Sequence, residues 1–343
     1  MILSKGERPT LAYIAQSVGV STSTVSKVLN GRDDVAAATR TDILEALRKA
    51  GYRSPAQRRL TAGPIVVEVA LDGFSACLPT VLGGILETAS EEGVDVRLSI
   101  ASGSGPKRDS DRKSQPMPNK RRDGLIIVTT ASDDSDLTPL RAQSIPVVVV
   151  DPFNSRSGVV SIGATNWAGG RSATEHLLNL GHRRIAYLGG PASAECNQAR
   201  MHGYCSALML SGIDITPGLV IHGKFHVEHG VAGLAELLAS PNRPTAIFAA
   251  NDDIAVGVLR EAHRRRIRVP EDLSLVGFDG TVMAENSVPA LTSVAQPLRD
   301  MGRTALRALL RQVRGEQLGT DRFELTTSLV IRESTGPVIA GQT

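Results

Sequence analysis

Apolar residues between positions 10 and 30 recur at the spacing of two short helices. In the first helix they follow the i, i+3, i+4, i+7 rule: Leu11, Ile14, Ala15 and Val18. Thr10 stands where a helix N-cap is expected, and Gly19 follows the last apolar position, where its tolerance of positive φ would end the helix. A second helix then begins with Ser21 as its cap, so the pattern predicts two helices joined by a tight turn.

The second predicted helix has a narrow apolar stripe and a broad polar face. The stripe consists of Val25, Val28 and Leu29, and the polar face consists of Thr22, Ser23, Ser26, Lys27 and Asn30. Hydroxyl groups bond to phosphate oxygens and lysine bonds to guanine O6 and N7, so this face suits the major groove of DNA. A solvated helix hairpin without any DNA contact fits the same pattern, and both interpretations stay open at this point.

A third helix is predicted over residues 39–50, with Ile43, Leu44 and Leu47 as its apolar positions. It would close a three-helix domain of about 50 residues. Residues 53–64 follow as a linker that contains arginines and prolines, a composition typical of a solvated connector.

Beyond residue 65, short apolar runs alternate with helical patterns. Runs typical of buried strands are residues 65–70, 94–100, 125–128, 147–150, 185–188, 246–249 and 273–276. Helical spacing is found over residues 81–89, 170–180, 198–211, 230–239 and 254–266. This alternation predicts an α/β fold with two parallel sheets, each covered on both faces. Residues 102–122 break the rhythm, and we expect a polar surface loop there, with a nucleic-acid contact as the minor alternative.

Polar residues stand directly after several of the predicted strands: Asp72, Asp151, Asn251, Asp252 and Asp279. Ligands of doubly wound sheets bind beyond the carboxyl ends of the strands, so these side chains are candidates for one polar cleft. Each of them could instead cap a helix or form a turn. Arg200 adds a guanidinium suited to sugar hydroxyls or a carboxylate, although it could also pair with an acid on a helix surface.

The composition is that of a soluble protein with more than one core, at 343 residues, 41% hydrophobic and 21% charged. No apolar run approaches the roughly 18 residues of a membrane span, and the first residues lack a secretory signal, so we expect a cytoplasmic protein without membrane contact. Residues 1–62 hold ten Lys and Arg against five Asp and Glu, while the remainder is slightly acidic. A basic N-terminal segment supports contact with nucleic acid.

Signatures of enzymes and metal sites are weak. The sequence contains no G-x-G-x-x-G, G-x-x-x-x-G-K-[ST] or G-x-S-x-G motif. The three cysteines lack the spacing of metal ligands and are expected to be reduced, buried thiols. Residues 222–229 hold three histidines, but no Cys or carboxylate partner stands at metal-site spacing. We therefore expect no enzymatic activity, no cofactor and no metal.

Several segments resemble the lactose-repressor/galactose-repressor (LacI/GalR) family of bacterial transcription regulators. The N-terminal similarity rests on residues 20–30, VSTSTVSKVLN, followed by Val35, Thr39, Arg40 and residues 50–52. Three later segments are similar to the effector-site segments of the family: residues 200–204, 249–252 and 276–279. Residues 181–186, Gln296 and residues 327–335 also match. The resemblance covers nearly the whole chain, and residues 101–122 and the linker depart from it.

The resemblance implies an N-terminal three-helix helix-turn-helix DNA-binding domain and a two-lobed, periplasmic-binding-protein-like core of doubly wound parallel sheets. The expected boundaries are 8–52 for the DNA-binding domain and 53–64 for the hinge. The first subdomain of the core would span 65–164, with 296–325 returning to it. The second would span 165–295, with 326–336 returning to it, and 337–343 would form a tail.

The resemblance also implies a homodimeric regulator, expected to be a repressor, that binds a near-palindromic operator in double-stranded DNA. A small molecule in the cleft, expected to be a sugar or oligosaccharide, would change the DNA affinity, and a nucleobase stays open as the effector. The alternative is a ligand-independent DNA-binding or architectural protein with a vestigial cleft. The irregular linker and residues 102–122 motivate that alternative.

The implied DNA contacts are of three kinds. Thr22, Ser23 and Lys27 are expected to read bases, with Lys27 at a position where the family usually carries arginine. The expected phosphate contacts are Thr10, Ser21, Thr24 and Asn30, with Ser26 on the same helix face. Leu60 is the expected minor-groove wedge. It lies eight residues after Tyr52, one fewer than in the family, and Ser-Pro-Ala replaces the usual Pro-Asn-Ala.

The implied effector contacts are Asp72, Asn166, Trp167, Arg200, Phe225, Asn251, Asp252 and Asp279. Phe225 falls where members of the family often carry an aromatic residue that stacks on a sugar ring. Trp167 is the only tryptophan of the chain, and it could line the cleft or pack in a core.

Overall fold

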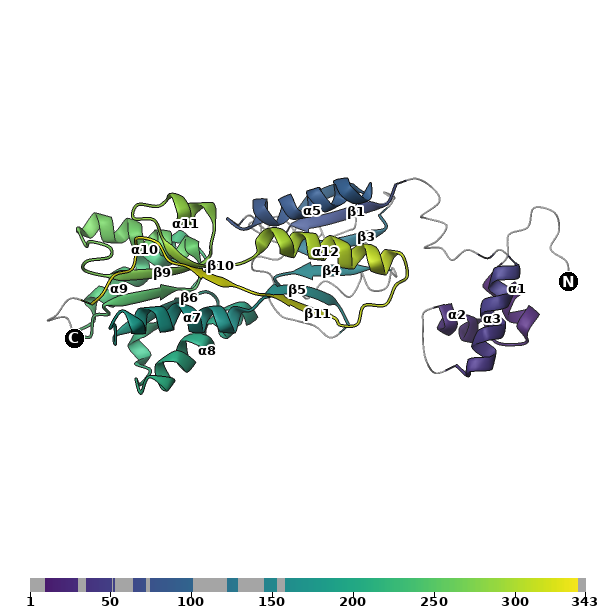
Figure 1. The fold of residues 1–343 in the computed structure, drawn as a ribbon, viewed down its shortest axis with the longest axis horizontal. Helices are drawn as coiled ribbons and strands as arrows, with labels where there is room; N and C mark the ends of the chain where they lie inside the picture. Colours follow the sequence, from purple (N-terminus) through teal and green to yellow (C-terminus); the bar gives the residue numbers. More distant parts are fainter. Residues whose placement is uncertain are drawn as a thin grey trace, which may run out of the picture. The chain divides into compact units, whose positions relative to one another are not determined.

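The computed structural model describes residues 10–29, 35–50, 52, 64–71, 75–100, 122–128, 145–152 and 158–338. The chain divides into two units, 1–64 and 65–343, and both are drawn in Figure 1. Three predicted site residues, Asn30, Leu60 and Asp72, lie outside the described residues, as does nearly all of the predicted loop over 102–122. None of the helices in the described ranges is long and apolar enough to cross a membrane.

The first unit consists of three short helices around one apolar core: α1 Leu11–Val18, α2 Thr22–Leu29 and α3 Ala37–Lys49. The buried side chains of this core are Ile14, Ala15, Val25, Val28, Ile43 and Leu47. All six belong to the predicted apolar stripes, whereas Leu44, also in the third stripe, is exposed on α3. Gly19 ends α1 with a φ of 75°, as expected, and this lets the chain turn directly into α2.

The first sheet of the second unit contains six parallel strands among the described residues, in the order β11-β5-β4-β3-β1-β2. They are β1 Val66–Leu71, β2 Asp95–Ile100, β3 Gly124–Val128, β4 Val147–Val150, β5 Val160–Ala164 and β11 Arg322–Leu325. The apolar runs of the sequence predicted β1 to β4. β5 and β11 were not predicted, and β11 joins the sheet edge from near the end of the chain.

The second sheet has the order β12-β10-β9-β8-β6-β7 in the described residues, with β12 antiparallel to β10 and the other pairs parallel. Its strands are β6 Ile185–Gly189, β7 Val220–His222, β8 Ala246–Ala249, β9 Ser274–Asp279, β10 Thr292–Ala295 and β12 Ser328–Val330. Every residue of β6, β8 and β9 is buried, as their continuous apolar runs predicted. The predicted α/β fold with two parallel sheets is confirmed.

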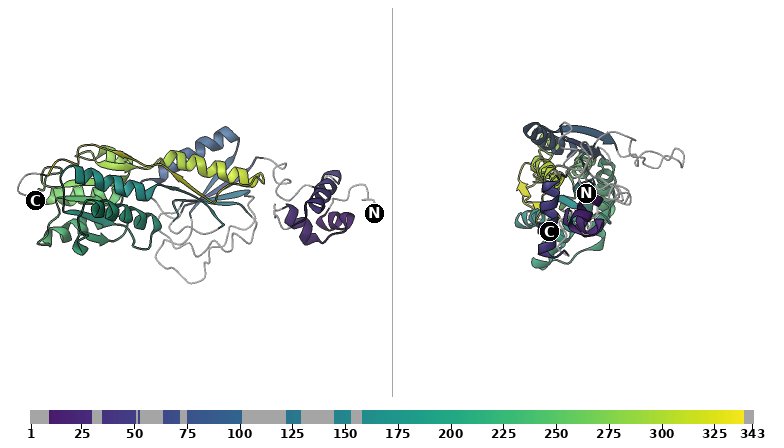
Figure 2. Two further views of the ribbon diagram at one scale, coloured as in Figure 1. Left: turned by 60° about the horizontal axis from the view of Figure 1, so that its bottom comes forward. Right: turned by 90° about the vertical axis from the view of Figure 1, so that its right-hand side faces the viewer.

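Helices cover both sheets, and Figures 1 and 2 show two lobes. The first lobe is the first sheet with two helices that pack against each other, α5 Leu78–Glu92 and α12 Leu298–Val313. The second lobe is the second sheet with α7 Asn166–Asn179, α8 Glu195–Leu210, α9 Val227–Ala239, α10 Asp252–Arg265 and α11 Val282–Asn286. A short 3-10 turn, Pro217–Leu219, precedes β7.

Helices α7 and α8 approach so closely that glycine is required where they touch. A Cβ atom on Gly170 would lie 2.2 Å from the backbone oxygen of Arg200. A Cβ atom on Gly203 would lie 2.2 Å from the backbone oxygen of Trp167. Because no side chain separates the two backbones, α8 has a fixed position on α7, and this places Arg200 beside the first turn of α7.

The chain passes between the two lobes three times within the described residues: from β5 into α7, from β10 into α12 and from β11 into β12. Two of these passages are bonded to each other. The side-chain oxygens of Thr165 and Thr327 lie 3.0 Å apart, and the Thr327 N–H donates to Thr165 Oγ1 at 2.9 Å. The lobes are therefore joined by paired segments of chain rather than by one flexible strand.

Candidate functional site

The polar face of α2 begins at a capped N-terminus. Ser21 Oγ accepts the Thr24 N–H at 3.1 Å and lies 2.7 Å from Ser23 Oγ, which confirms Ser21 as the cap. The exposed side chains of this face are Thr22, Ser23 and Lys27, and the half-buried ones are Thr24 and Ser26. Since the apolar side of α2 packs in the core, these hydroxyls and the ammonium point outward, where they can reach phosphates and base edges.

Thr10 caps α1 in the same way, because its side-chain oxygen accepts the Tyr13 N–H at 3.2 Å. The N-terminus of a helix attracts anions through its free N–H groups and its dipole. Two hydroxyl-capped helix starts in so small a unit are therefore compatible with phosphate binding. The caps are confirmed, and phosphate contact by Thr10, Ser21 and Thr24 remains a prediction.

In the second unit, Arg200 is the centre of a buried polar cluster. Its Nε donates to Asn166 Oδ1 at 2.9 Å, and its Nη1 donates to the backbone oxygen of Ala250 at 2.7 Å and lies 3.5 Å from Asp279 Oδ1. The guanidinium carbon lies 3.8 Å from the centre of the Phe278 ring, and the residue is only 2% exposed. Arg200, Asn166 and Asp279, three of the predicted effector residues, are thus brought together.

Asp279 ends β9 in a conformation that is unusual for a residue other than glycine, with φ at 107°. Its carboxylate accepts the Gln296 side-chain N–H at 2.7 Å. Burial raises the pKa of Asp279 to about 7, and the nearby Arg200 opposes this rise. Asp151, at the end of β4, also has a positive φ of 49°, so both strand-end acids occupy strained backbone positions.

Two other predicted effector residues have structural hydrogen bonds instead. Asn251 caps α10 by accepting the Ile254 N–H at 2.9 Å. Asp252 is fully buried and accepts bonds from the Thr281 N–H at 2.7 Å and the Ser293 hydroxyl at 2.6 Å. None of Arg200, Asp279, Asn251 and Asp252 lines the cavity described next, and contact of these four residues with an effector stays a prediction.

A cavity of about 280 Å³ opens beside this cluster, between elements of the two lobes. Its lining residues are Asp151, Pro152, Ser161, Gly163, Ala164, Thr165, Asn166, Trp167, Ala168, Glu195, Cys196, Ala199, Arg322, Phe323 and Glu324. Trp167 is 44% exposed and lines this cavity rather than a core. Phe225 does not line this cavity. Its ring instead packs against Gly190, and a Cβ atom on Gly190 would lie 2.3 Å from the ring.

Of the charged residues on this wall, Asp151 was predicted as a cleft residue, whereas Glu195, Arg322 and Glu324 were missed. Glu195 begins α8, and Arg322 and Glu324 come from β11, so a large interval of sequence separates them. Gln296, which holds Asp279, was recognised as a matching position but not as a site residue, and its Oε1 is buried without a partner among the described residues. Gln296 could have been predicted as a site residue, because it directly follows β10 of the second sheet.

The described residues contain no cluster of three or more His, Cys, Asp and Glu side chains that could hold a metal ion. The three cysteines are free thiols, and each is half-buried, whereas buried thiols were expected. Cys196 lines the cavity, and burial raises the pKa of its thiol to about 12.

Two comparisons with protein families agree with this division of the chain. Residues 10–54 match "Bacterial regulatory proteins, lacI family", and residues 174–335 match "Periplasmic binding protein-like domain". The HTH-type transcriptional regulator CelR of Thermobifida fusca is 33% identical over 97% of this chain and 100% of its own length.

Solved structures give the same result over the whole chain. A transcriptional regulator CelR–cellobiose complex has a TM-score of 0.70 at 30% identity and covers 95% of this chain and 100% of that one. The lac repressor dimer bound to operator and the anti-inducer ONPF has a TM-score of 0.68 at 27% identity and covers 96% and 100%. With the helix pair, the two lobes and these similarities taken together, the chain belongs to the LacI family of bacterial regulatory proteins.

Proposed function

We propose that this regulator is a repressor that binds a near-palindromic operator as a homodimer. A small carbohydrate that enters the cleft either lowers or raises its affinity for the operator. The observation that carries the DNA-binding part is the capped helix α2 with Thr22, Ser23 and Lys27 exposed on one face. The lac repressor relative is a dimer on operator DNA, and a two-fold dimer places two such helices on two half-sites.

A carbohydrate suits the cleft because its wall combines aromatic side chains with hydrogen-bonding groups. Trp167 and Phe323 contribute aromatic side chains to the wall, and Asn166, Thr165 and Ser161 contribute polar ones. In this conformation these three polar side chains bond within the protein, so a sugar hydroxyl would share or replace those bonds. One relative has been solved with cellobiose and another with ribose. The volume of about 280 Å³ is at the lower limit for ligand pockets, which favours a small sugar.

The proposed control is a population shift between arrangements of the lobes. A ligand that contacts both lobes binds one arrangement more tightly and so changes how often it is populated. Coupling energies of about 1 to 3 kcal/mol are typical and correspond to about 5- to 150-fold in DNA affinity. The linker over residues 53–64, with Leu60 as its proposed wedge, would carry this change to the DNA-binding unit.

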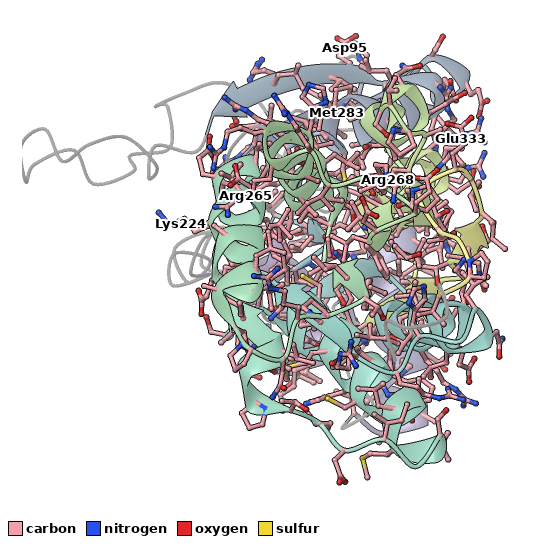
Figure 3. The ribbon with its side chains drawn as sticks, turned by 90° about the vertical axis from the view of Figure 1, so that its left-hand side faces the viewer. Asp95, Lys224, Arg265, Arg268, Met283 and Glu333 are labelled. Atoms are coloured by element: carbon pink, nitrogen blue, oxygen red, sulfur yellow. The ribbon has the colours of Figure 1, made fainter. Side chains whose placement is uncertain are left out.

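The test is selection of operator sequences by the purified protein, followed by affinity measurements over a salt series. Lys27→Ala should weaken binding to the selected site and relax its base preference. Lys224→Ala is the matched control, because Lys224 is an exposed lysine of the second unit (Figure 3). We expect this control to leave binding unchanged.

A selected near-palindrome whose affinity responds to a sugar would support the proposal. Binding that depends on salt but not on sequence would instead favour the architectural alternative. A sequence-specific site that responds to no sugar, nucleoside or nucleobase would contradict the effector part alone.

A further inference from the structure

The cavity beside Trp167 is lined by more acidic than basic side chains. Asp151, Glu195 and Glu324 contribute carboxylates, and Arg322 is the one lysine or arginine on the described wall. A ligand that carries its own negative charge would meet like charges here, and like-charge contacts in a partly enclosed site are strongly unfavourable. An uncharged or amino-bearing ligand meets no such repulsion.

Arg322 is already shared between two of these carboxylates. Its Nη1 lies 3.0 Å from Glu195 Oε1, and its Nη2 lies 2.8 Å from Glu324 Oε1. An anionic ligand at this guanidinium would lie next to two carboxylates that already bond to it and partly offset its charge. The pair also joins the start of α8 in the second lobe to β11 in the first, so Glu195 is held at the cavity from both lobes.

Glu195 occupies the place where an anion would otherwise be favoured. It lies in the first turn of α8, and no side chain caps this helix end. The N–H groups and the dipole at a helix start attract phosphate and carboxylate groups of ligands. Here the protein supplies its own carboxylate at that end of the helix.

Arg200, which is buried beside the cavity and does not line it, offers an anion little access. It is 2% exposed, and its Nε and Nη1 already donate to Asn166 and to the backbone oxygen of Ala250. Its Nη1 also lies 3.5 Å from Asp279 Oδ1. Binding of an anion at Arg200 would therefore require several bonds inside the protein to break.

We infer that the cleft selects against anionic ligands, and that Glu195, held by Arg322, is the residue that excludes them. The effector class is then an uncharged or amino-bearing polyol, not a sugar phosphate, a sugar acid or a nucleotide. This inference rests on the proposed function, because it concerns the same cleft.

The test uses the full-length protein and a matched set of probes: cellobiose, ribose, glucose, glucosamine, glucose 6-phosphate, ribose 5-phosphate and gluconate. Trp167 is the only tryptophan of the chain and lines the cavity, so its fluorescence reports binding there. Thermal shift gives a second readout that does not depend on fluorescence. We expect each anionic probe to bind at least about tenfold more weakly than its uncharged or amino-bearing counterpart.

Glu195→Gln should reduce this discrimination, because it removes one carboxylate and frees Arg322 to meet an anion. Glu324→Gln is a second variant that acts on the same guanidinium from an exposed strand, in case the change at Glu195 disturbs α8. Glu228→Gln is the matched control, because Glu228 also lies in the first turn of a helix, α9, and it is exposed and does not line the cavity. The control should keep the wild-type discrimination.

Tighter binding of a sugar phosphate or acid than of its uncharged counterpart would overturn the inference and leave the proposed function standing. In that case the anion would be expected at the start of α7, whose first residues also line the cavity. Unchanged discrimination in both glutamate variants would overturn the role of Glu195 and Arg322. Binding of no probe of any charge would count against the carbohydrate effector as well.

Discussion

At the scale of single residues, Asp279 should make the stability of the protein depend on pH. Burial raises its pKa from 3.8 to about 7, with Arg200 opposing the rise and Asp252 and Asp151 adding to it. Between these pH values the folded protein keeps a proton that the unfolded chain has lost. Its free energy of unfolding should therefore fall as the pH rises from about 4 to about 7.

The measurement is denaturant unfolding of the wild type and of Asp279→Asn over this pH range. The variant should show a smaller fall, because asparagine does not titrate. Asp214→Asn, at an exposed position, is the control and should follow the wild type. Identical pH dependence in wild type and Asp279→Asn would show that Asp279 is not the titrating group.

The hydrogen bonds of the buried Asp252 should make it important for stability. Asp252→Ala leaves the Thr281 N–H and the Ser293 hydroxyl without their acceptor, and we expect a loss of about 3 kcal/mol in the free energy of unfolding. The neighbouring Asp253→Ala, at a half-buried position, should cost much less. Equal losses in the two variants, measured by denaturant unfolding, would contradict this assignment.

At the scale of helices and strands, the glycine contact between α7 and α8 should be intolerant of any side chain. Gly203→Ala would place a Cβ atom 2.2 Å from the Trp167 backbone oxygen, so the helices must move apart. We expect a loss of about 2 to 3 kcal/mol in stability and a change in Trp167 fluorescence. Gly218→Ala is the control, because its Cβ would have no neighbour within 4 Å. An unchanged thermal midpoint in Gly203→Ala would refute the close contact.

The long apolar strands were predictable because they are buried on both faces. β6, β8 and β9 read as continuous apolar runs and were found within a few residues of their observed bounds. β11 and β12 were missed because they are partly exposed strands that contain polar residues, although β11 is as long as the predicted β8. Their pairing with distant strands decides their conformation, and no local pattern reveals it.

Helix α12 was missed for a different reason. Its buried residues, from Leu298 to Val313, recur at helical spacing, and this pattern was overlooked. What the sequence alone does not indicate is where the arginines between them find partners. In the fold they meet the acids of α5: Arg303 bonds to Glu87 at 2.8 Å and Arg314 bonds to Glu92 at 2.7 Å. The same limit applies to the candidate site. The Arg200 cluster was predicted from the polar residues at strand ends and from the family resemblance. The pair of Arg322 and Glu195 was not predictable in this way, because it forms only when β11, near the end of the chain, joins the first sheet beside the cavity.

At the scale of the whole core, the paired passages between the lobes should stabilise both of them together. Thr327→Val removes the hydroxyl that lies 3.0 Å from Thr165 Oγ1, and we expect a loss of about 1 kcal/mol in the free energy of unfolding. The exposed neighbour Thr326→Val should have little effect. Denaturant unfolding compares the two, and an equal effect of both changes would argue against a special role for the Thr165–Thr327 bond.

The return of α12 and β11 to the first lobe also sets an order of events during protein synthesis. The ribosome finishes β5 long before it makes Leu298, the first residue of α12. At about 5 to 20 residues per second, the first sheet waits on the order of ten seconds for the helix that covers it. The second lobe receives most of its strands and helices within that interval. Its sheet can therefore be largely assembled while the earlier one still exposes apolar surface, and each sheet receives its last strand only near the end of translation, β11 for the first and then β12 for the second.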